Sequence, residues 1–178
     1  MESFEDVLAV GGHANSLGRS AEVLKLVQTD RNRVKELFEC IFAEDAWVRM
    51  RAIDTFEKLV RNNPAATKPF VQRIVSDLTK SEQASIQWHV AQLFTEIELD
   101  DKQTSHAIKW LKKRLSTTEV DWIVAVESMK ALIHFHEQGS VLSEDLPTLF
   151  AIQKDHSSNT VRKKAQMFLD DLAKNKFY

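Results

Sequence analysis

Residues 45–60, which read DAWVRMRAIDTFEKLV, carry the pattern that decides the fold. Their apolar residues lie three or four positions apart, which places them on one side of an α-helix. A single helix cannot bury such a side alone, so the pattern predicts packing partners elsewhere in the chain. The apolar positions are Val48, Ala52, Ile53, Phe56, Leu59 and Val60.

The same pattern returns three times along the chain. In each copy a large apolar residue follows a small or slender one by four positions, an arrangement that suits the close packing of two helices. The small residues lie 38, 35 and 40 residues apart in sequence. They are Ala52, Val90, Ala125 and Ala165, and the large residues are Phe56, Phe94, Met129 and Leu169.

Each copy is preceded by a second amphipathic segment, so the repeating unit is two helices in about 38 residues. We predict an all-α fold, an α-α superhelix of about four helix pairs, which forms one domain over residues 1–178. Residues 30–175 hold the repeats, and residues 1–29 form an N-terminal helical cap. A simple helix bundle is the alternative, but it gives no reason for a recurring period. The preceding segments are 34–41, 70–78, 107–115 and 146–152.

The second segment of each unit resembles the HEAT repeat, in which an acidic loop residue precedes Val-Arg and then Ala. Residues 45–52 match best through Asp45, Val48-Arg49 and Ala52, and residues 159–165 match through Val161-Arg162 and Ala165. The other two copies keep less of the motif. The resemblance implies an armadillo-like superhelix whose second helices line the inner, partner-binding face. It also implies contacts between loops at Asp45/Arg49 and Asn159/Arg162.

When the four copies are aligned on their small residues, two sets of equivalent positions lie away from the apolar side of the second helices. Each set is one column of this alignment. We predict that these columns form the binding surface for a protein or peptide, since exposed aromatic, Met and branched side chains are typical of such surfaces. Alternatively, Trp88 and Ile123 are buried against neighbouring repeats. The columns are Met50, Trp88, Ile123 and Lys163, followed one turn later by Asp54, Gln92, Glu127 and Met167.

Charge and composition indicate no attraction to a highly charged partner. The 24 basic and 26 acidic residues give a formal net charge of −2, which favours neither nucleic acid nor acidic lipid. A single cysteine, Cys40, excludes an internal disulfide framework. The acidic start of the chain lacks the basic character of a targeting signal, and no stretch approaches the roughly 18 apolar residues of a membrane span. We therefore expect a cytoplasmic protein without a membrane segment.

Motifs typical of enzymes are missing from the sequence, which predicts a protein without catalytic residues or a cofactor. His134 and His136 are the best candidates for metal ligands. Residues two apart on a helix point about 200° away from each other, so these two cannot chelate together, and we predict no metal site. The segment 11–16, which reads GGHANS, could bind an anion, but a helix end followed by a cap is the preferred interpretation.

Two basic runs, at 109–114 and 162–164, support nucleic-acid binding as the competing hypothesis. Some DNA alkylation-repair glycosylases are built from HEAT-like helices and hold DNA on a basic face. Acidic residues alternate with the basic ones here, and no paired Trp and Asp resemble the signature of those enzymes. A solvated charged surface is therefore the preferred interpretation of both runs, and a protein or peptide is the preferred partner.

Overall fold

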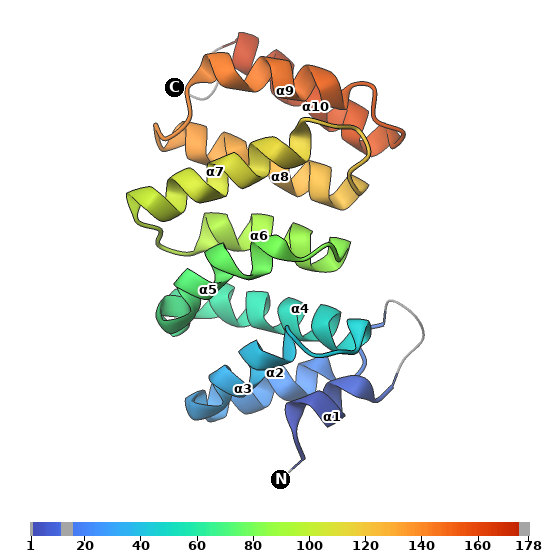
Figure 1. Cartoon of the computed structure of the whole chain (residues 1–178), viewed down its shortest axis with the longest axis vertical. Coiled ribbons are helices and arrows are strands. Elements are labelled where there is room, and N and C mark those ends of the chain that lie inside the picture. Colours follow the sequence, from blue (N-terminus) through green and yellow to red (C-terminus); the bar gives the residue numbers. More distant parts are fainter. Residues whose placement is uncertain (1, 12–15, 175–178) are drawn as a thin grey trace.

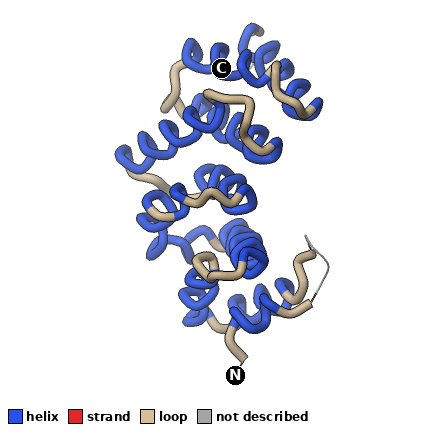
Figure 2. The backbone as a smooth tube through the Cα atoms, turned by 45° about the vertical axis from the view of Figure 1, so that its right-hand side comes forward, coloured by secondary structure: helices blue, strands red, loops and turns tan. Residues whose placement is uncertain are grey.

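The computed structural model describes residues 2–11 and 16–174 and consists of helices joined by loops (Figures 1 and 2). Helices make up 76% of the structure, and no strand occurs in the described ranges, which confirms the predicted all-α class. The α-helices are α1 (Phe4–Ala9), α2 (Ser20–Thr29), α3 (Val34–Cys40), α4 (Ala46–Asn62), α5 (Val71–Ser76), α6 (Ala84–Glu96), α7 (Asp101–Leu115), α8 (Trp122–Glu137), α9 (Leu146–Gln153) and α10 (Asn159–Ala173).

The helices follow one another along the long axis of the molecule, with α1 and α10 at opposite ends (Figure 1). The second helices α4, α6, α8 and α10 contact each other in that order. On one side of this row, α3, α7 and α9 pack against α4, α8 and α10, and α7 also contacts α5 and α9. The helices therefore form two layers, with α4, α6, α8 and α10 in one and α3, α7 and α9 in the other.

A continuous apolar core lies between the two layers. Phe56 and Phe94, the large residues predicted to fill the helix contacts, are both buried. The ring of Phe56 packs on Phe38 of α3, with centroids 5.2 Å apart, and the ring of Phe94 meets Trp110 of α7 edge-on at 5.9 Å. These two rings of second helices thus pack against aromatic rings of first helices, which joins the layers.

Side chains near the start of the second helices bind the loops that precede them. Arg49 Nη1 donates to the carbonyl oxygens of Ala43 and Glu44, at 2.8 and 2.7 Å. Arg49 Nε donates to Gln83 Oε1 at 2.7 Å. The resemblance placed Asp45 beside Arg49, but Asp45 accepts from the backbone N–H groups of Trp47 and Val48 and caps α4. The arginine therefore binds carbonyl oxygens and an amide.

Hydrogen bonds between neighbouring helix pairs join residues about one predicted repeat apart. Arg61 pairs with Glu96, 35 positions later, and Gln153 Nε2 donates to Leu115 O, 38 positions earlier. Comparable spacings of 31 to 34 residues occur on the first-helix side of the molecule. Segments that lie about one predicted repeat apart in the sequence thus contact each other.

The second helix pair departs from the predicted pattern. Residues 70–78 were expected to form most of one helix, but α5 covers only Val71–Ser76. It lies between the 3₁₀ segments η2 (Pro64–Phe70) and η3 (Leu78–Lys80). Pro64 and Pro69 both lie in η2, and a proline has no N–H to donate to the preceding turn. The two prolines account for the start of α5 only at Val71.

The first helix of the third pair, by contrast, is longer than predicted. α7 begins at Asp101 because the Asp100 carboxylate accepts from Gln103 N at 2.8 Å, while Gln103 Oε1 accepts from Asp100 N at 3.0 Å. This reciprocal cap stabilises the start of a helix. None of the described helices combines the length and the apolar character that a membrane span requires.

Candidate binding surface

The eight residues predicted to bind a partner lie on the four second helices, two on each. We call this set the second-helix face: Met50 and Asp54 on α4, Trp88 and Gln92 on α6, Ile123 and Glu127 on α8, and Lys163 and Met167 on α10. All eight are partly or fully exposed, whereas most neighbouring positions on α4, α6 and α8 are buried. These helices contact each other in the order α4, α6, α8 and α10.

Trp88 and Ile123, for which burial was the alternative interpretation, are half-buried. The Trp88 indole stacks on the imidazole of His89, with ring centroids 3.4 Å apart. The buried His89 Nδ1 lies 2.6 Å from Ser85 O, and its Nε2 lies 3.8 Å from Asp54 Oδ1 on α4. The Trp88 indole is therefore supported by the imidazole of His89, which also links α6 to α4 through Asp54.

Asp54 is charged although its side chain is mostly buried. Burial opposes ionisation, but contacts with His89 and Lys58 outweigh burial and hold the pKa of Asp54 below its ordinary value. Lys58 Nζ lies 2.7 Å from Asp54 Oδ2. The face thus presents a fixed ion pair beside Trp88, which can orient a polar group of a partner.

A second ionic group lies where α4 and α6 meet, one turn beyond Asp54. Arg61 bridges two carboxylates: its Nη2 lies 2.5 Å from Glu57 Oε1, and its Nε lies 2.9 Å from Glu96 Oε1. Glu57 is 3% exposed. Its burial, followed by the charge of Glu96, raises the pKa of Glu57 to about 7, against the opposing effect of Arg61. This cluster joins two helices and changes charge near neutral pH.

The face becomes more exposed and more polar towards the C-terminus. Glu127 on α8 pairs with Lys130 at 2.7 Å. On α10, Lys163 is exposed and Met167 is 40% exposed. Lys164 Nζ lies 5.2 Å from the centroid of the Phe168 ring. On α10 the face therefore presents one exposed cation and one exposed apolar side chain.

Trp47 belongs with this face, although the sequence pattern did not predict it. It is 39% exposed and lies seven residues before Asp54 on α4. Seven residues are close to two helical turns, so the two side chains leave α4 on nearly the same side. The seven-residue spacing to Asp54 could have identified Trp47 from the sequence. It gives the face a second indole, on α4, next to the helix that carries Trp88.

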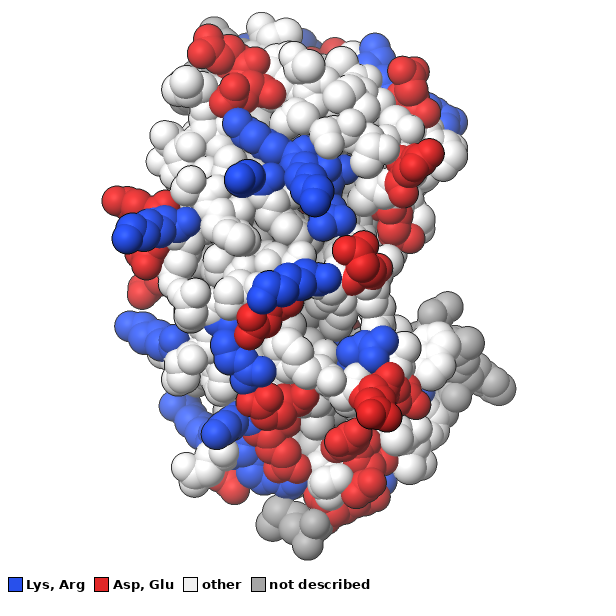
Figure 3. All heavy atoms as spheres, in the orientation of Figure 1, with Lys and Arg blue, Asp and Glu red and all other residues white. Residues whose placement is uncertain are grey.

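The two basic runs do not form one surface. Residues 109–114 lie on α7 in the first layer, and residues 162–164 lie on α10 in the second. Figure 3 shows Lys and Arg side chains gathered over α7, with Asp and Glu side chains nearby. Lys112 pairs with Asp145 at 2.9 Å, and Arg162 Nη1 donates to the carbonyl oxygens of His156 and Ser157. Two of these cations, Lys112 and Arg162, therefore already have partners within the chain.

The two histidines considered as metal ligands have separate partners. His134 Nε2 lies 2.9 Å from the Gln138 amide, whereas the buried His136 directs Nδ1 to Val141 O at 2.8 Å. No group of three or more potential metal ligands occurs in the described part of the chain. Of the proposed anion segment at 11–16, residues 12–15 lie outside the described residues.

The comparisons with known proteins identify no relative. No protein-family model, no curated protein and no solved structure matches the chain.

Proposed function

We propose that the chain is a HEAT-like α-α superhelix that binds a protein or peptide along the second-helix face, without catalysis and without a cofactor. The repeated spacing of contacts between neighbouring helix pairs supports the architecture. So do the equivalent hydrogen bonds of Arg49 and Arg162 to their preceding loops. The single unpaired Cys40 fits a location in the cytoplasm.

The observation that carries the proposal is that large side chains remain accessible on adjoining second helices. Trp88 and Ile123 are half-buried, and Trp47 and Met167 are exposed. Much of α4, α6 and α8 is buried against neighbouring helices, whereas these side chains are apolar groups that remain accessible to a partner. Trp is the residue most enriched among those that dominate binding energies.

The test compares a variant of this face with a matched variant elsewhere. Trp88→Ala combined with Glu127→Lys removes an anchor and reverses a charge on the face. Leu142→Ala combined with Glu144→Lys makes the same kinds of change at exposed residues between α8 and α9. The partner is first recovered with the tagged wild-type chain and identified by mass spectrometry.

Dissociation constants are then measured for the purified partner and each folded variant. We expect the face variant to bind roughly tenfold or more weakly, and the loop variant to bind like the wild type. Equal binding by both variants would show that the partner uses another surface.

Nucleic-acid binding is the competing function, and it needs a continuous basic surface. The separation of the two basic runs on different layers counts against it. Fluorescence anisotropy with a labelled DNA duplex, measured between about 50 and 200 mM salt, distinguishes the two functions because phosphate contacts weaken steeply with salt. Tight, salt-sensitive binding would favour the competing function.

A further inference from the structure

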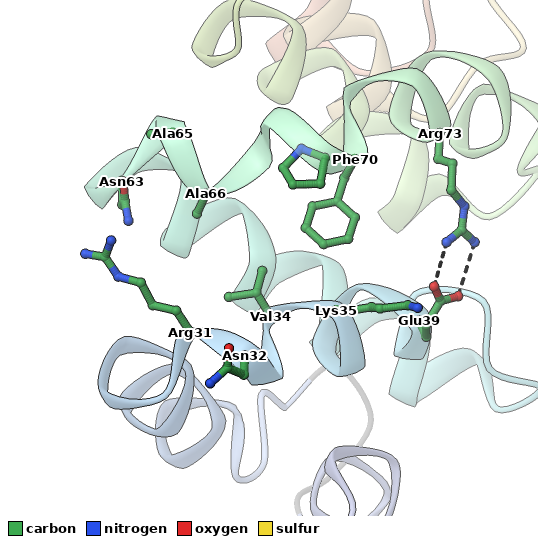
Figure 4. Close-up of a pocket in the computed structure, with 11 residues that line it drawn as sticks. Arg31, Asn32, Val34, Lys35, Glu39, Asn63, Ala65, Ala66, Phe70 and Arg73 are labelled. Atoms are coloured by element: carbon green, nitrogen blue, oxygen red, sulfur yellow. Dashed lines mark hydrogen bonds and ion pairs between the residues drawn. The ribbon is translucent and has the colours of Figure 1, made fainter.

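A cleft of about 530 Å³ opens on the first-helix side of the molecule, between α3 and η2 (Figure 4). Its volume lies within the range of about 300–1,000 Å³ that is typical of ligand sites. None of the residues of the second-helix face lines it. Its apolar residues are Val34, Ala65, Ala66, Pro69 and Phe70.

The cleft follows from the interruption of the first helix of the second pair. Phe70, at the end of η2, turns its ring inward to stack on Phe38 of α3, with centroids 4.5 Å apart. Pro69 and the small side chains of Ala65 and Ala66 leave the space beside that ring unfilled. Figure 4 shows the side chains of Val34 and Phe70 directed towards each other across this space.

Positive charge predominates around the cleft. Arg31, Lys35 and Arg73 contribute cations, and Glu39 contributes the one carboxylate among the lining residues. That carboxylate is bound to Arg73, with Glu39 Oε1 2.6 Å from Nη1 and Oε2 3.2 Å from Nη2. Within the described residues, neither Arg31 nor Lys35 has an ion pair. The charge balance therefore favours an anionic ligand.

Two amide side chains lie at the same end of the cleft as Arg31. Figure 4 shows Asn32 beside Arg31, and Arg31 extending towards Asn63 on the opposite wall. Neither amide group makes a side-chain hydrogen bond in the part of the chain that the structure describes. An amide side chain can both donate and accept, which matches the N–H and C=O groups of a peptide backbone.

We infer that this cleft binds an extended peptide of a partner protein, in which an apolar side chain lies next to an acidic one. The apolar side chain enters the space beside Val34 and Phe70, and the acidic side chain pairs with Arg31. Asn32 and Asn63 are placed to meet the peptide backbone between them. This site is separate from the second-helix face, so either site can fail its test without the other.

Three short peptides, acetylated and amidated at their ends, test this chemistry on the full chain. The probe is Glu-Leu-Phe-Asp. One control, Lys-Leu-Phe-Lys, reverses the charge, and the other, Glu-Ser-Ser-Asp, removes the apolar side chains. Binding is followed through the backbone amide signals in two-dimensional ¹H–¹⁵N NMR titrations. The probe is expected to bind roughly tenfold more tightly than either control, with the largest shifts at residues 31–39 and 63–73.

Two variants and a matched control complete the test. Arg31→Glu should weaken binding of the probe roughly tenfold and favour the lysine peptide, and Ala66→Trp should abolish binding by filling the cleft. Lys109→Glu, the same charge change at an exposed residue of α7, should leave the affinity unchanged. Equal affinities for the three peptides, shifts outside the cleft, or full binding by Arg31→Glu would each overturn the inference.

Discussion

Arg49 and Arg162, near the starts of α4 and α10, bind their preceding loops in the same way. The Nη1 atom of each donates to the carbonyl oxygens of the residues five and six positions earlier, at 2.7 to 2.8 Å. Gln87 on α6 makes half of this arrangement, donating to Ser81 O, six positions earlier, at 2.9 Å. The contact depends on both the side chain and the path of the loop, so its recurrence is stronger support for a repeat than apolar spacing alone.

Replacing Arg49 should therefore destabilise the fold through the loop. Arg49→Ala leaves two carbonyl oxygens and the Gln83 amide without this donor, and we expect a loss of about 1–3 kcal/mol in the free energy of unfolding. Arg49→Lys should recover only part of it, because an ammonium group lacks the planar, multiple donors of a guanidinium. Urea unfolding measures both losses. If Arg49→Lys were as stable as the wild type, the planar arrangement of the guanidinium donors would make no contribution to stability.

We expect Phe56 and Phe42 to contribute differently to stability, because Phe56 is buried in the core between the layers and Phe42 is partly exposed. Phe56→Ala should lower the free energy of unfolding by about 3–5 kcal/mol, because its buried ring contacts Phe38 and Phe70. Phe42→Ala is the matched control. Its ring is 40% exposed, so we expect a loss below about 1.5 kcal/mol. Equal losses in urea unfolding would show that Phe56 does not join the two layers.

The cluster of Glu57, Arg61 and Glu96 predicts a pH dependence of stability. The pKa of Glu57 rises from 4.5 to about 7 on folding, so between these values the folded chain keeps a proton that the unfolded chain has lost. The stabilisation that this proton gives the folded chain is fully present below about pH 4.5 and is lost as the pH rises through 7. The free energy of unfolding then falls by up to about 1.4 kcal/mol per pH unit. The lowered pKa of Asp54 has the opposite effect on stability, because its contribution is lost as the pH falls. This loss occurs at lower pH than the titration of Glu57.

Glu57→Gln removes this titration, so the variant should gain stability relative to the wild type as the pH rises from about 4.5 to 7. Urea unfolding at several pH values measures the difference. Glu119→Gln, at an exposed residue of the α7–α8 loop, should follow the wild type throughout. If the free energies of unfolding of the wild type and of Glu57→Gln changed with pH in parallel, the pKa of Glu57 would lie near its ordinary value.

Cys40 should be chemically inert in the folded protein. It is 5% exposed, and burial raises the pKa of its thiol to about 12. Because the thiolate is the reactive form, iodoacetamide at about pH 8 should alkylate the native chain at least roughly tenfold more slowly than the chain in urea. Mass spectrometry follows the reaction. Similar rates in both conditions would indicate an accessible thiol.

The sequence predicted the helices best where the apolar spacing is regular, as in α4 and α10. The eight positions predicted to face a partner are all at least partly accessible, because burial follows the same periodicity, but the exposed Trp47 was missed. The contact between Glu57 and Glu96 could not be predicted, since it depends on how α4 and α6 are aligned along their axes. The cleft at Phe70 was also missed, because the 3₁₀ path through Pro64 and Pro69 is a local departure from the repeat.

Photo-crosslinking in cells shows whether a partner protein binds the second-helix face. The photoreactive residue p-benzoylphenylalanine replaces Trp88 on α6 in one chain and the exposed Lys109 on α7 in another. Both chains are irradiated in cells of the native source, and the products are identified by mass spectrometry. We expect one partner protein to be crosslinked at position 88 and not at position 109. Crosslinking of that partner at 109 alone would contradict binding on the second-helix face.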